Sequence, residues 1–411
     1  MVAMNEQSMR PTDLALAFLV AAVVVAASAG ATAVAGHAAG WSGAGWAALH
    51  LVLLGGVSLL VIGISQFFVT AFLATTPPSR RLVFSQISCW VAGSVAVVTG
   101  VSLEIDPLTV AGVALLLAAL LLYARSLATL HSRSLQSAPW ASRWYVACGI
   151  WLLGGIALGL MLALQMTWSH GSLLGAHLAF NLCGWLGGAI VGTLHTFAPS
   201  LTQTMLRFPR LQPVTFGFWS GGIGSMALGY AFGSGDLVIV GWSLLTLGAG
   251  LLAVNLLASA LAAEQPLSLP ARLVVWSQVF LPLGLGFGLV SSFDHPLAPL
   301  FGGDRTVLAV LLLVGWVGLT VIGSMLHLLS VVVRVRDLTR PVAAPNRFRD
   351  AFLAAVALAA VALLALAEVA EAGRLAELAR GAMLLVAVTL TSLVVRSVVL
   401  ALRMGPKKRP G

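Results

Sequence analysis

Long apolar stretches, each of about 20 residues, follow one another along the whole chain. Such a stretch crosses the hydrocarbon of a bilayer as one α-helix, because a helix bonds its own backbone polar groups where no water is present. Hydrophobic residues make up 59% of the chain and charged residues only 9%, whereas about a quarter of a soluble domain is charged. The sequence therefore predicts an all-α integral membrane protein, residues 1–411 forming a single polytopic domain. Twelve transmembrane helices are expected, at 14–35, 48–73, 83–101, 109–130, 143–166, 173–198, 213–232, 237–262, 271–291, 305–333, 349–370 and 376–403.

Basic residues are distributed unevenly between the two ends of these helices. With the N-terminus in the cytoplasm, 19 of the 22 Lys and Arg residues lie at or near cytoplasmic ends, and only Arg305, Arg374 and Arg380 lie outside. The positive-inside rule thus predicts a multi-pass protein with both termini cytoplasmic. The composition, with Arg far above Lys and much Ala and Gly, points to a bacterial plasma membrane. The net charge of +9 reflects this topology and contact with the lipid bilayer, not nucleic-acid binding. The sequence does not indicate an oligomeric state.

A glycine-containing motif recurs three times at nearly equal intervals. Its first glycine is Gly55, Gly184 or Gly315, and the successive steps are 129 and 131 residues. A period this long is not that of a solenoid repeat. With twelve helices it predicts three pseudo-repeated four-helix units, with the motif on the second helix of each unit. The units span approximately 14–130, 143–262 and 271–403.

Histidines in and beside the motif helices are the candidate ligands. His50 and His177 begin the first two copies of the motif, His170 lies in the loop before the second, and His195 and His327 lie near the inner ends of the second and third motif helices. An ionisable side chain inside a span is costly and usually faces the bundle interior. Imidazole is also a common ligand of haem iron, copper and zinc. We therefore predict His50, His177, His195 and His327 as metal ligands; the alternative is buried imidazoles bonded to backbone or hydroxyl groups.

The glycines and tryptophans of the motif admit two interpretations. Gly184 and Gly315 let helices approach closely in lipid, or they provide clearance for a flat cofactor. Trp185 and Trp316 lie deep in their spans, so their indoles require a partner or a protein-lined pocket. These four residues are predicted to line a cofactor site together with His50, His177 and His170.

The motifs resemble those of a known superfamily. The middle copy, His177-LAFNLC-Gly184-Trp185-LGGAIVGTLHTFAPSLTQT, is similar to HAHLNLLGWVGLTVLGTL followed by a Pro-containing stretch. The first copy, His50-LVLLGG, is similar to HLFLLGG, and the third, Val314-Gly315-Trp316…Gly323-SMLHLLSVVV, resembles VGW…GxLSYLLPVV. These are motifs of a divergent bacterial membrane family, similar to haem-copper oxidase subunit I. In actinobacteria especially, its members are joined to multicopper-oxidase or copper nitrite reductase-like domains.

The resemblance implies a haem-copper oxidase subunit I-like arrangement of twelve helices, with ligand histidines on helices 2, 6 and 10. It implies haem b, copper or both as cofactors, and an extracytoplasmic copper protein or a cytochrome as redox partner. The chain departs from the pattern at Ala179, where the family has a second histidine, and at Phe67, where another is expected. Helix 10 also lacks a histidine at its outer end, so a complete oxygen-reducing centre is not expected.

Three functions follow as hypotheses. The first is a haem- or copper-binding protein for electron transfer or for the response to copper or nitrogen oxides, and an oxidoreductase if it is an enzyme; no catalytic residue is indicated. The second is a transporter of a small solute or metal, and the third is a non-catalytic assembly subunit of a respiratory complex. No Asp or Glu lies in the middle of a span, whereas proton-coupled carriers usually need such a carboxylate.

Overall fold

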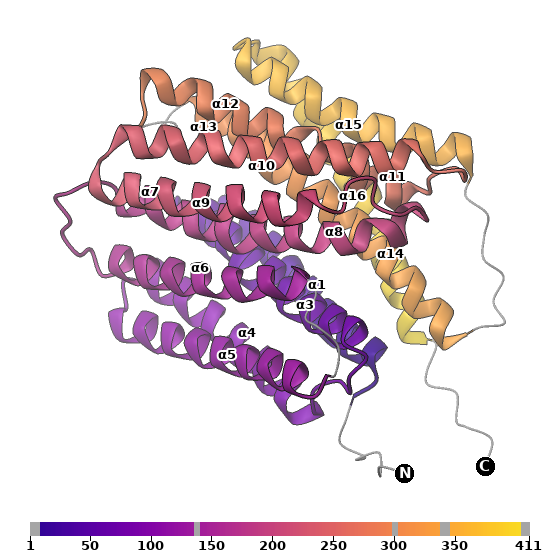
Figure 1. The fold of residues 1–411 in the computed structure, drawn as a ribbon. Helices are drawn as coiled ribbons and strands as arrows, with labels where there is room; N and C mark the ends of the chain where they lie inside the picture. The colour runs from indigo at the N-terminus through magenta and orange to yellow at the C-terminus, as the bar shows by residue number, and fades with distance from the viewer. Residues whose placement is uncertain (1–8, 135–139, 298–302, 338–345, 404–411) are drawn as a thin grey trace. The chain divides into compact units, whose positions relative to one another are not determined.

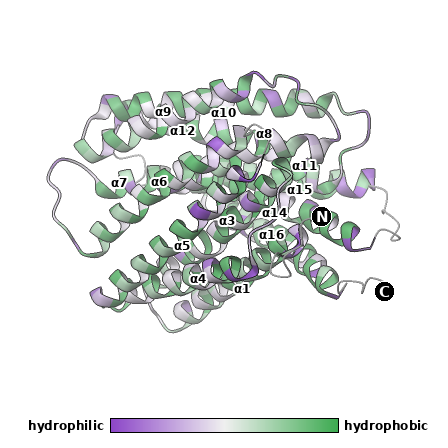
Figure 2. Cartoon of the chain, turned by 60° about the horizontal axis from the view of Figure 1, so that its bottom comes forward, coloured by the Kyte–Doolittle hydropathy of each residue, from purple (hydrophilic) through white to green (hydrophobic). Residues whose placement is uncertain are grey.

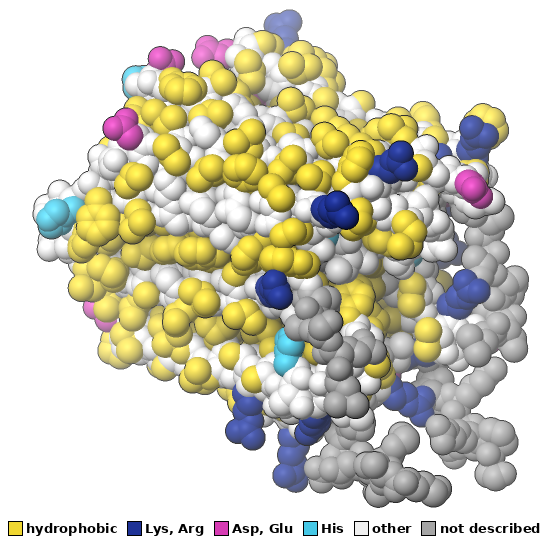
Figure 3. All heavy atoms as spheres, in the orientation of Figure 1, with side chains coloured by type: hydrophobic (Ala, Val, Ile, Leu, Met, Phe, Trp, Pro, Cys, Tyr) yellow, Lys and Arg dark blue, Asp and Glu magenta, His cyan; other side chains and the backbone are white. Residues whose placement is uncertain are grey.

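The computed structural model describes residues 9–134, 140–297, 303–337 and 346–403, and this part of the chain is helical with no strand (Figure 1). Eleven of its helices are long and apolar enough to cross a membrane. Hydrophobic residues dominate the helices in Figure 2 and form broad bands on the face shown in Figure 3. The predicted all-α membrane class is confirmed at this level.

The helices match the predicted spans closely. In chain order, the helices up to residue 202 are α1 (Pro11–Ala38), the helix Ala44–Phe72, α4 (Arg80–Ser102), α5 (Asp106–Ser132), α6 (Trp140–Ala163) and the helix Leu173–Thr202. They are followed by α9 (Leu211–Phe232), α10 (Gly235–Leu261), the helix Leu269–Asp294, the helix Arg305–Arg336, α15 (Arg347–Val369) and α16 (Gly373–Arg403).

The span predicted at 213–232 is the exception. It forms α9, a helix of 22 residues, but α9 is not among the eleven helices apolar enough to be assigned to the membrane by composition. Gln212, Thr215 and several glycines and serines dilute its apolar residues. The part of the structure described here therefore supports eleven spans by composition and twelve helices of sufficient length.

The chain forms two compact units, Met1–Gly192 and Thr193–Gly411. The same helix pairs recur within them. The first helix of each predicted repeat packs on the motif helix that follows it, as α1 does on Ala44–Phe72 and α6 on Leu173–Thr202, and as the helix Leu269–Asp294 does on Arg305–Arg336. The third and fourth helices also pair: α4 with α5, α9 with α10, and α15 with α16. The recurrence agrees with the sequence period, although three separate four-helix units stay a prediction.

Local sequence signals explain where many helices begin and end. Ser79, Ser172, Ser234 and Asn346 each accept a hydrogen bond from the backbone N–H three residues further on, at the N-termini of α4, α7 (Leu173–Leu178), α10 and α15. Such caps satisfy one of the backbone donors that a helix start leaves without a partner. Gly233, at a φ of 68°, ends α9 in the left-handed conformation that glycine adopts without steric cost.

Small residues set the closest helix approaches. A Cβ added to Gly100 would lie 2.6 Å from the backbone nitrogen of Thr109, and one added to Gly112 would lie 2.7 Å from that of Val97. Helices α4 and α5 therefore touch along their backbones, as van der Waals packing between membrane helices requires.

Each motif helix contains a π-helical segment, which the sequence analysis did not predict. The segments are η1 (Leu51–Val57), η2 (Ala179–Gly187) and η3 (Ala309–Gly318). All three include the first motif glycine, so they fall on the same turn of the repeat. A π-helical turn is rare, shifts the backbone bonding by one residue and is frequent at functional sites. The repeat is thus expressed in the backbone and not only in the residue pattern.

Candidate functional site

His50 and His177 occupy matching places beside two of the π-helices. His50 is the last residue of α2 (Ala44–His50), directly before η1, and His177 lies in α7, two residues before η2. Both side chains are half-buried within the unit Met1–Gly192. The two histidines that the sequence singled out first therefore occupy similar places at the start of two π-helical segments.

Backbone carbonyls fix the proton on both imidazole rings. Nδ1 of His50 lies 2.9 Å from the carbonyl oxygen of Trp46, and Nδ1 of His177 lies 2.9 Å from that of Gly155. A carbonyl oxygen can only accept, so these contacts are hydrogen bonds when Nδ1 carries the hydrogen; Nδ1 of His177 also lies 3.2 Å from Asn181 Nδ2. Nε2 of each neutral ring then holds a lone pair. This is how metal-binding histidines are commonly arranged, with the second ring nitrogen donating to a carbonyl or carboxylate.

A hydrogen bond joins the first two motif helices eight residues after each of the two histidines. Trp185 Nε1 donates to Ser58 Oγ at 2.9 Å, and Ser58 Oγ donates to the carbonyl oxygen of Leu53 inside η1, also at 2.9 Å. His50 precedes Ser58 by eight residues, and His177 precedes Trp185 by eight residues.

Glycines on α6 make room for the second histidine and its neighbour. A Cβ on Gly159 would lie 3.0 Å from Cε1 of His177, and a Cβ on Gly155 would lie 2.6 Å from Oδ1 of Asn181. Nδ2 of Asn181 donates to the carbonyl oxygen of His177 at 2.8 Å, where η2 begins. Larger residues on α6 would displace the imidazole, so α6 positions His177 as much as its own helix does.

Aromatic side chains lie against the outer histidines. The rings of Trp46 and His50 have centroids 4.1 Å apart, and those of Trp168 and His170 lie 5.2 Å apart. His170 is exposed in the segment before α7. Its ring contact is with Trp168 and not with His177. The structure therefore places His170 just before the start of the second motif helix, in contact with Trp168.

The two inner histidines belong to the other compact unit. His195 is buried in α8 (Gly188–Thr202), and Pro199, four residues later, has no N–H to donate to its carbonyl. His327 lies in α14 (Leu319–Arg336), with Nε2 3.2 Å from Ser200 Oγ and its ring 5.3 Å from that of Phe197. Among the described residues no group of three or more His, Cys, Asp and Glu side chains could hold a metal ion. The described histidines therefore form no cluster of three or more such side chains.

Both motif tryptophans have the hydrogen-bond partner that their depth requires. Trp185 donates to Ser58, as described above, and Trp316 Nε1 donates to Gln278 Oε1 at 2.9 Å. Gln278 lies where the helix Leu269–Asp294 is interrupted, between α11 (Leu269–Ser277) and α12 (Phe280–Asp294). Pro282 explains the interruption, because it cannot donate to the carbonyl four residues earlier. The Gln278 amide also donates to Thr320 Oγ1 at 3.1 Å.

The motif glycines lie against neighbouring helices. A Cβ on Gly184 would come within 2.6 Å of Trp151 Cβ, and one on Gly315 within 2.8 Å of a methyl group of Val361. Each glycine therefore allows a close helix contact, as the packing interpretation predicts. The role of these two glycines and of Trp185 and Trp316 in holding a cofactor stays a prediction.

A buried polar network was missed by the search for ligands. Gln66 Nε2 donates to Gln86 Oε1 at 2.8 Å, Ser126 Oγ donates to Gln66 Oε1 at 2.6 Å, and Ser65 Oγ bonds Tyr123 Oη at 2.8 Å. In the sequence, the only signal for this network was the presence of polar side chains inside apolar spans. Their mutual bonding joins α3 (Ser58–Phe72) to α4 and α5, because an amide without a partner in this environment would be costly.

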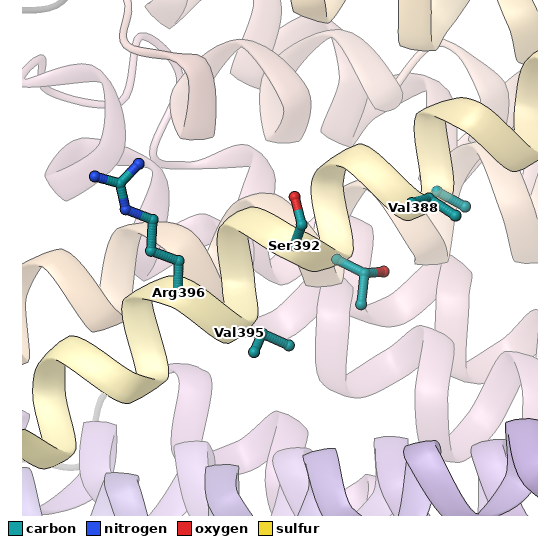
Figure 4. A pocket seen from close by; sticks show the side chains of 6 residues that line it. Val388, Ser392, Val395 and Arg396 are labelled. Atoms are coloured by element: carbon teal, nitrogen blue, oxygen red, sulfur yellow. The ribbon is translucent and has the colours of Figure 1, made fainter.

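A shallow groove that lies outside the predicted site is found on the surface of α16. It has a volume of about 590 Å³, and all its lining residues come from this one helix, among them Val388, Ser392, Val395 and Arg396 (Figure 4). Apolar side chains of this one helix form most of its surface, with Arg396 at one end. It contains none of the predicted ligand residues.

Neither known protein families nor curated proteins contain a match to this chain. The resemblance to the oxidase-like family therefore depends on the motifs themselves.

Proposed function

We propose that this chain is a membrane electron-transfer protein whose metal centre, a b-type haem or a copper ion, is held by His50 and His177. The observation that carries the proposal is the locked state of both rings. Two histidines on motif helices that are joined by the Trp185–Ser58 hydrogen bond both keep Nδ1 beside a carbonyl oxygen and leave Nε2 for a ligand. Buried histidines with a purely structural role would more often use both nitrogens within the protein.

The surrounding residues fit such a group. A bond from Nδ1–H to a carbonyl orients the ring and makes Nε2 more basic, which strengthens metal binding. Trp46 lies against the ring of His50, and Gly159 lets the ring of His177 lie close to α6. A haem or copper ion bound here would supply a one-electron redox couple, whose potential depends on the ligands and on the burial of the site. The chain's own part is to hold, orient and shield the ligands.

The wider activity follows the family resemblance. A role in electron transfer, or in the response to copper or nitrogen oxides, needs one redox centre near the outer face and an extracytoplasmic copper protein or cytochrome as partner. Oxygen reduction would need more ligands than the pair provides, and Ala179 and Phe67 replace two of the expected histidines.

The decisive experiment measures the haem and copper content and the visible spectrum of the purified full-length protein. His50→Ala and His177→Ala are each expected to lose the bound group, because one remaining imidazole cannot supply both bonds of about 2 Å. His131→Ala is the matched control: its Nδ1 bonds the carbonyl four residues earlier, at Leu127, as that of His50 does at Trp46. If both ligand variants keep the wild-type content, the centre does not exist.

A transporter is the second candidate, and one observation favours it. The helix Leu269–Asp294 is discontinuous, and interrupted helices form the substrate sites of many transporters. In this chain the gap is occupied by Gln278, whose amide bonds Trp316 and Thr320. A protein that contains neither haem nor copper, yet moves a solute into proteoliposomes in a Gln278-dependent way, would favour this function instead. The third candidate, an assembly subunit, predicts neither property and co-purification with a respiratory complex.

A further inference from the structure

A polar cavity of about 470 Å³ opens at the end of the unit Thr193–Gly411 that the positive-inside rule assigns to the cytoplasm. It lies between the segment that follows α8 and the connection from α10 to α11. The lining residues are Gln203, Thr204, Met205, Leu206, Arg207, Ala262, Glu264 and Gln265. None of them takes part in the histidine site or in the α16 groove.

Two buried side chains of α10 hold one wall of this cavity in place. Asn255 forms a pair of bonds with the backbone of Phe208: Phe208 N–H donates to Asn255 Oδ1 at 2.9 Å, and Asn255 Nδ2 donates to the Phe208 carbonyl at 3.0 Å. Arg207 N–H donates to Ser259 Oγ at 2.9 Å, and Thr204 Oγ1 donates to the Ser259 carbonyl at 3.1 Å. A segment tied at consecutive residues to buried groups is preorganised, which lowers the entropic cost of binding a ligand.

Opposite charges line the cavity without neutralising each other. Arg207 and Glu264 are both exposed, and neither belongs to an ion pair among the residues that the structure describes. The amides of Gln203 and Gln265 complete the polar lining. A cavity that presents one guanidinium and one carboxylate matches a ligand that carries both an anionic and a cationic group.

Apolar side chains at the same place indicate where that ligand comes from. Met205 lines the cavity and is 86% exposed, and Leu261, next to the lining residue Ala262, is 76% exposed. Unbranched and branched apolar chains this exposed are stable at a membrane surface, where they contact acyl chains. Charged and apolar groups therefore meet here as they do in a phospholipid.

We propose that the cavity binds the phosphoethanolamine headgroup of a membrane phospholipid. Arg207 binds the phosphate through its planar fork of N–H donors, and Glu264 binds the ammonium group. The acyl chains lie along Met205 and Leu261. This site is independent of the proposed metal centre.

The test uses full-length protein purified from membranes that contain both phosphatidylethanolamine and phosphatidylglycerol, with bound lipid measured by native mass spectrometry. We expect phosphatidylethanolamine to be enriched over its share of the membrane. Arg207→Gln and Glu264→Gln each remove one charge-assisted contact and should lower its retention about tenfold. Arg210→Gln is the matched control, because Arg210 lies three residues away, is exposed and does not line the cavity.

Further measurements distinguish the contribution of Arg207 from that of Glu264, and a membrane lipid from a soluble compound as the source of the ligand. If Glu264→Gln retains as much lipid, or exchanges it for phosphatidylglycerol, the cavity binds anions only and the zwitterion proposal is overturned. If free glycerophosphoethanolamine binds the delipidated protein as tightly as the lipid does, the source is a soluble compound and the lipid assignment is wrong. Equal loss in Arg210→Gln would mean that the whole basic surface, not the cavity, retains the lipid.

Discussion

The second and third copies of the motif share a backbone but not a ligand. Both contain a π-helix across the glycine-tryptophan pair, and in both the indole donates to a buried polar side chain. The second copy has His177 seven residues before its glycine, whereas the third has Leu308 at that position. The π-helix therefore does not depend on a metal ligand. It belongs to the packing of the motif, on which two of the three copies also carry a histidine.

The indole partners differ between these copies in a way that affects stability. In the second copy the acceptor is Ser58, whose hydroxyl also donates to a carbonyl. In the third copy the acceptor is the side-chain oxygen of Gln278, a residue with no exposed surface. The indole thus donates in both copies. Its acceptor is a single hydroxyl group in the second copy and a side-chain amide with further hydrogen-bond partners in the third.

The largest effect is expected from a substitution that disturbs the close packing of a motif helix on its neighbour. Gly192→Leu places a side chain where Trp144 already lies and should destabilise the protein by up to about 3 kcal/mol through overpacking. Gly149→Leu is the control, because no atom lies within 4 Å of an added Cβ there. Thermal unfolding in detergent measures both; equal stability would show that Gly192 does not support a close helix contact.

Trp316→Phe should have the next largest effect. It leaves the side-chain oxygen of Gln278 without its indole donor in a fully buried place, which costs about 2 kcal/mol. The double variant Trp316→Phe with Gln278→Leu removes both polar partners and is expected to recover part of that loss. No recovery in unfolding experiments would indicate that ring packing, not the hydrogen bond, makes Trp316 important.

Trp185→Phe should cost less than Trp316→Phe, about 1 kcal/mol. Ser58 Oγ loses its indole donor but still donates to the Leu53 carbonyl, so the hydroxyl keeps one hydrogen bond. The expected order of the two effects is wrong if the Trp185→Phe variant is less stable than the Trp316→Phe variant. In that case the link between the first two motif helices would matter more than the amide network of the third.

The smallest effect concerns the site itself. Gly159→Ala brings a methyl group to about 3 Å from the ring of His177, which must then shift by a few tenths of an ångström. We expect a metal or haem affinity lowered about tenfold, at the mild end of what outer-shell changes cause. Titration of the apoprotein with haem or copper checks this, and wild-type affinity would show that α6 does not position the imidazole.

Several features of the fold could be predicted from the sequence, each for a physical reason. Helix positions followed from apolar length, and the close contacts of Gly184 and Gly315 followed from the absence of a side chain. The need of Trp185 and Trp316 for partners followed from an indole N–H deep in an apolar span. The identity of those partners did not follow, because Ser58 and Gln278 lie 127 and 38 residues away in the sequence.

Other features had no local signal. Asp350, near the start of α15, is 3% exposed, accepts the backbone N–H of Leu269 at 3.3 Å and pairs with Arg349 at 3.0 Å. The carboxylate thereby caps the start of α11, a helix far away in the chain. Its role could not be assigned from its own segment, since an acidic residue in the first turn of a helix normally serves that helix.

By itself, the sequence determined the all-helical membrane class, the helix positions, the threefold motif and the histidines worth testing. Those properties depend on which residues are apolar, small or ionisable, and on their spacing. Only the tertiary structure decided that the motif helices contain π-helical turns, and that His50 and His177 hold Nδ1 against carbonyls. A π-turn adds one residue between backbone partners, and the carbonyl of Gly155 that holds His177 belongs to another helix. Such relations depend on how helices pack, which residue types and spacing do not encode locally.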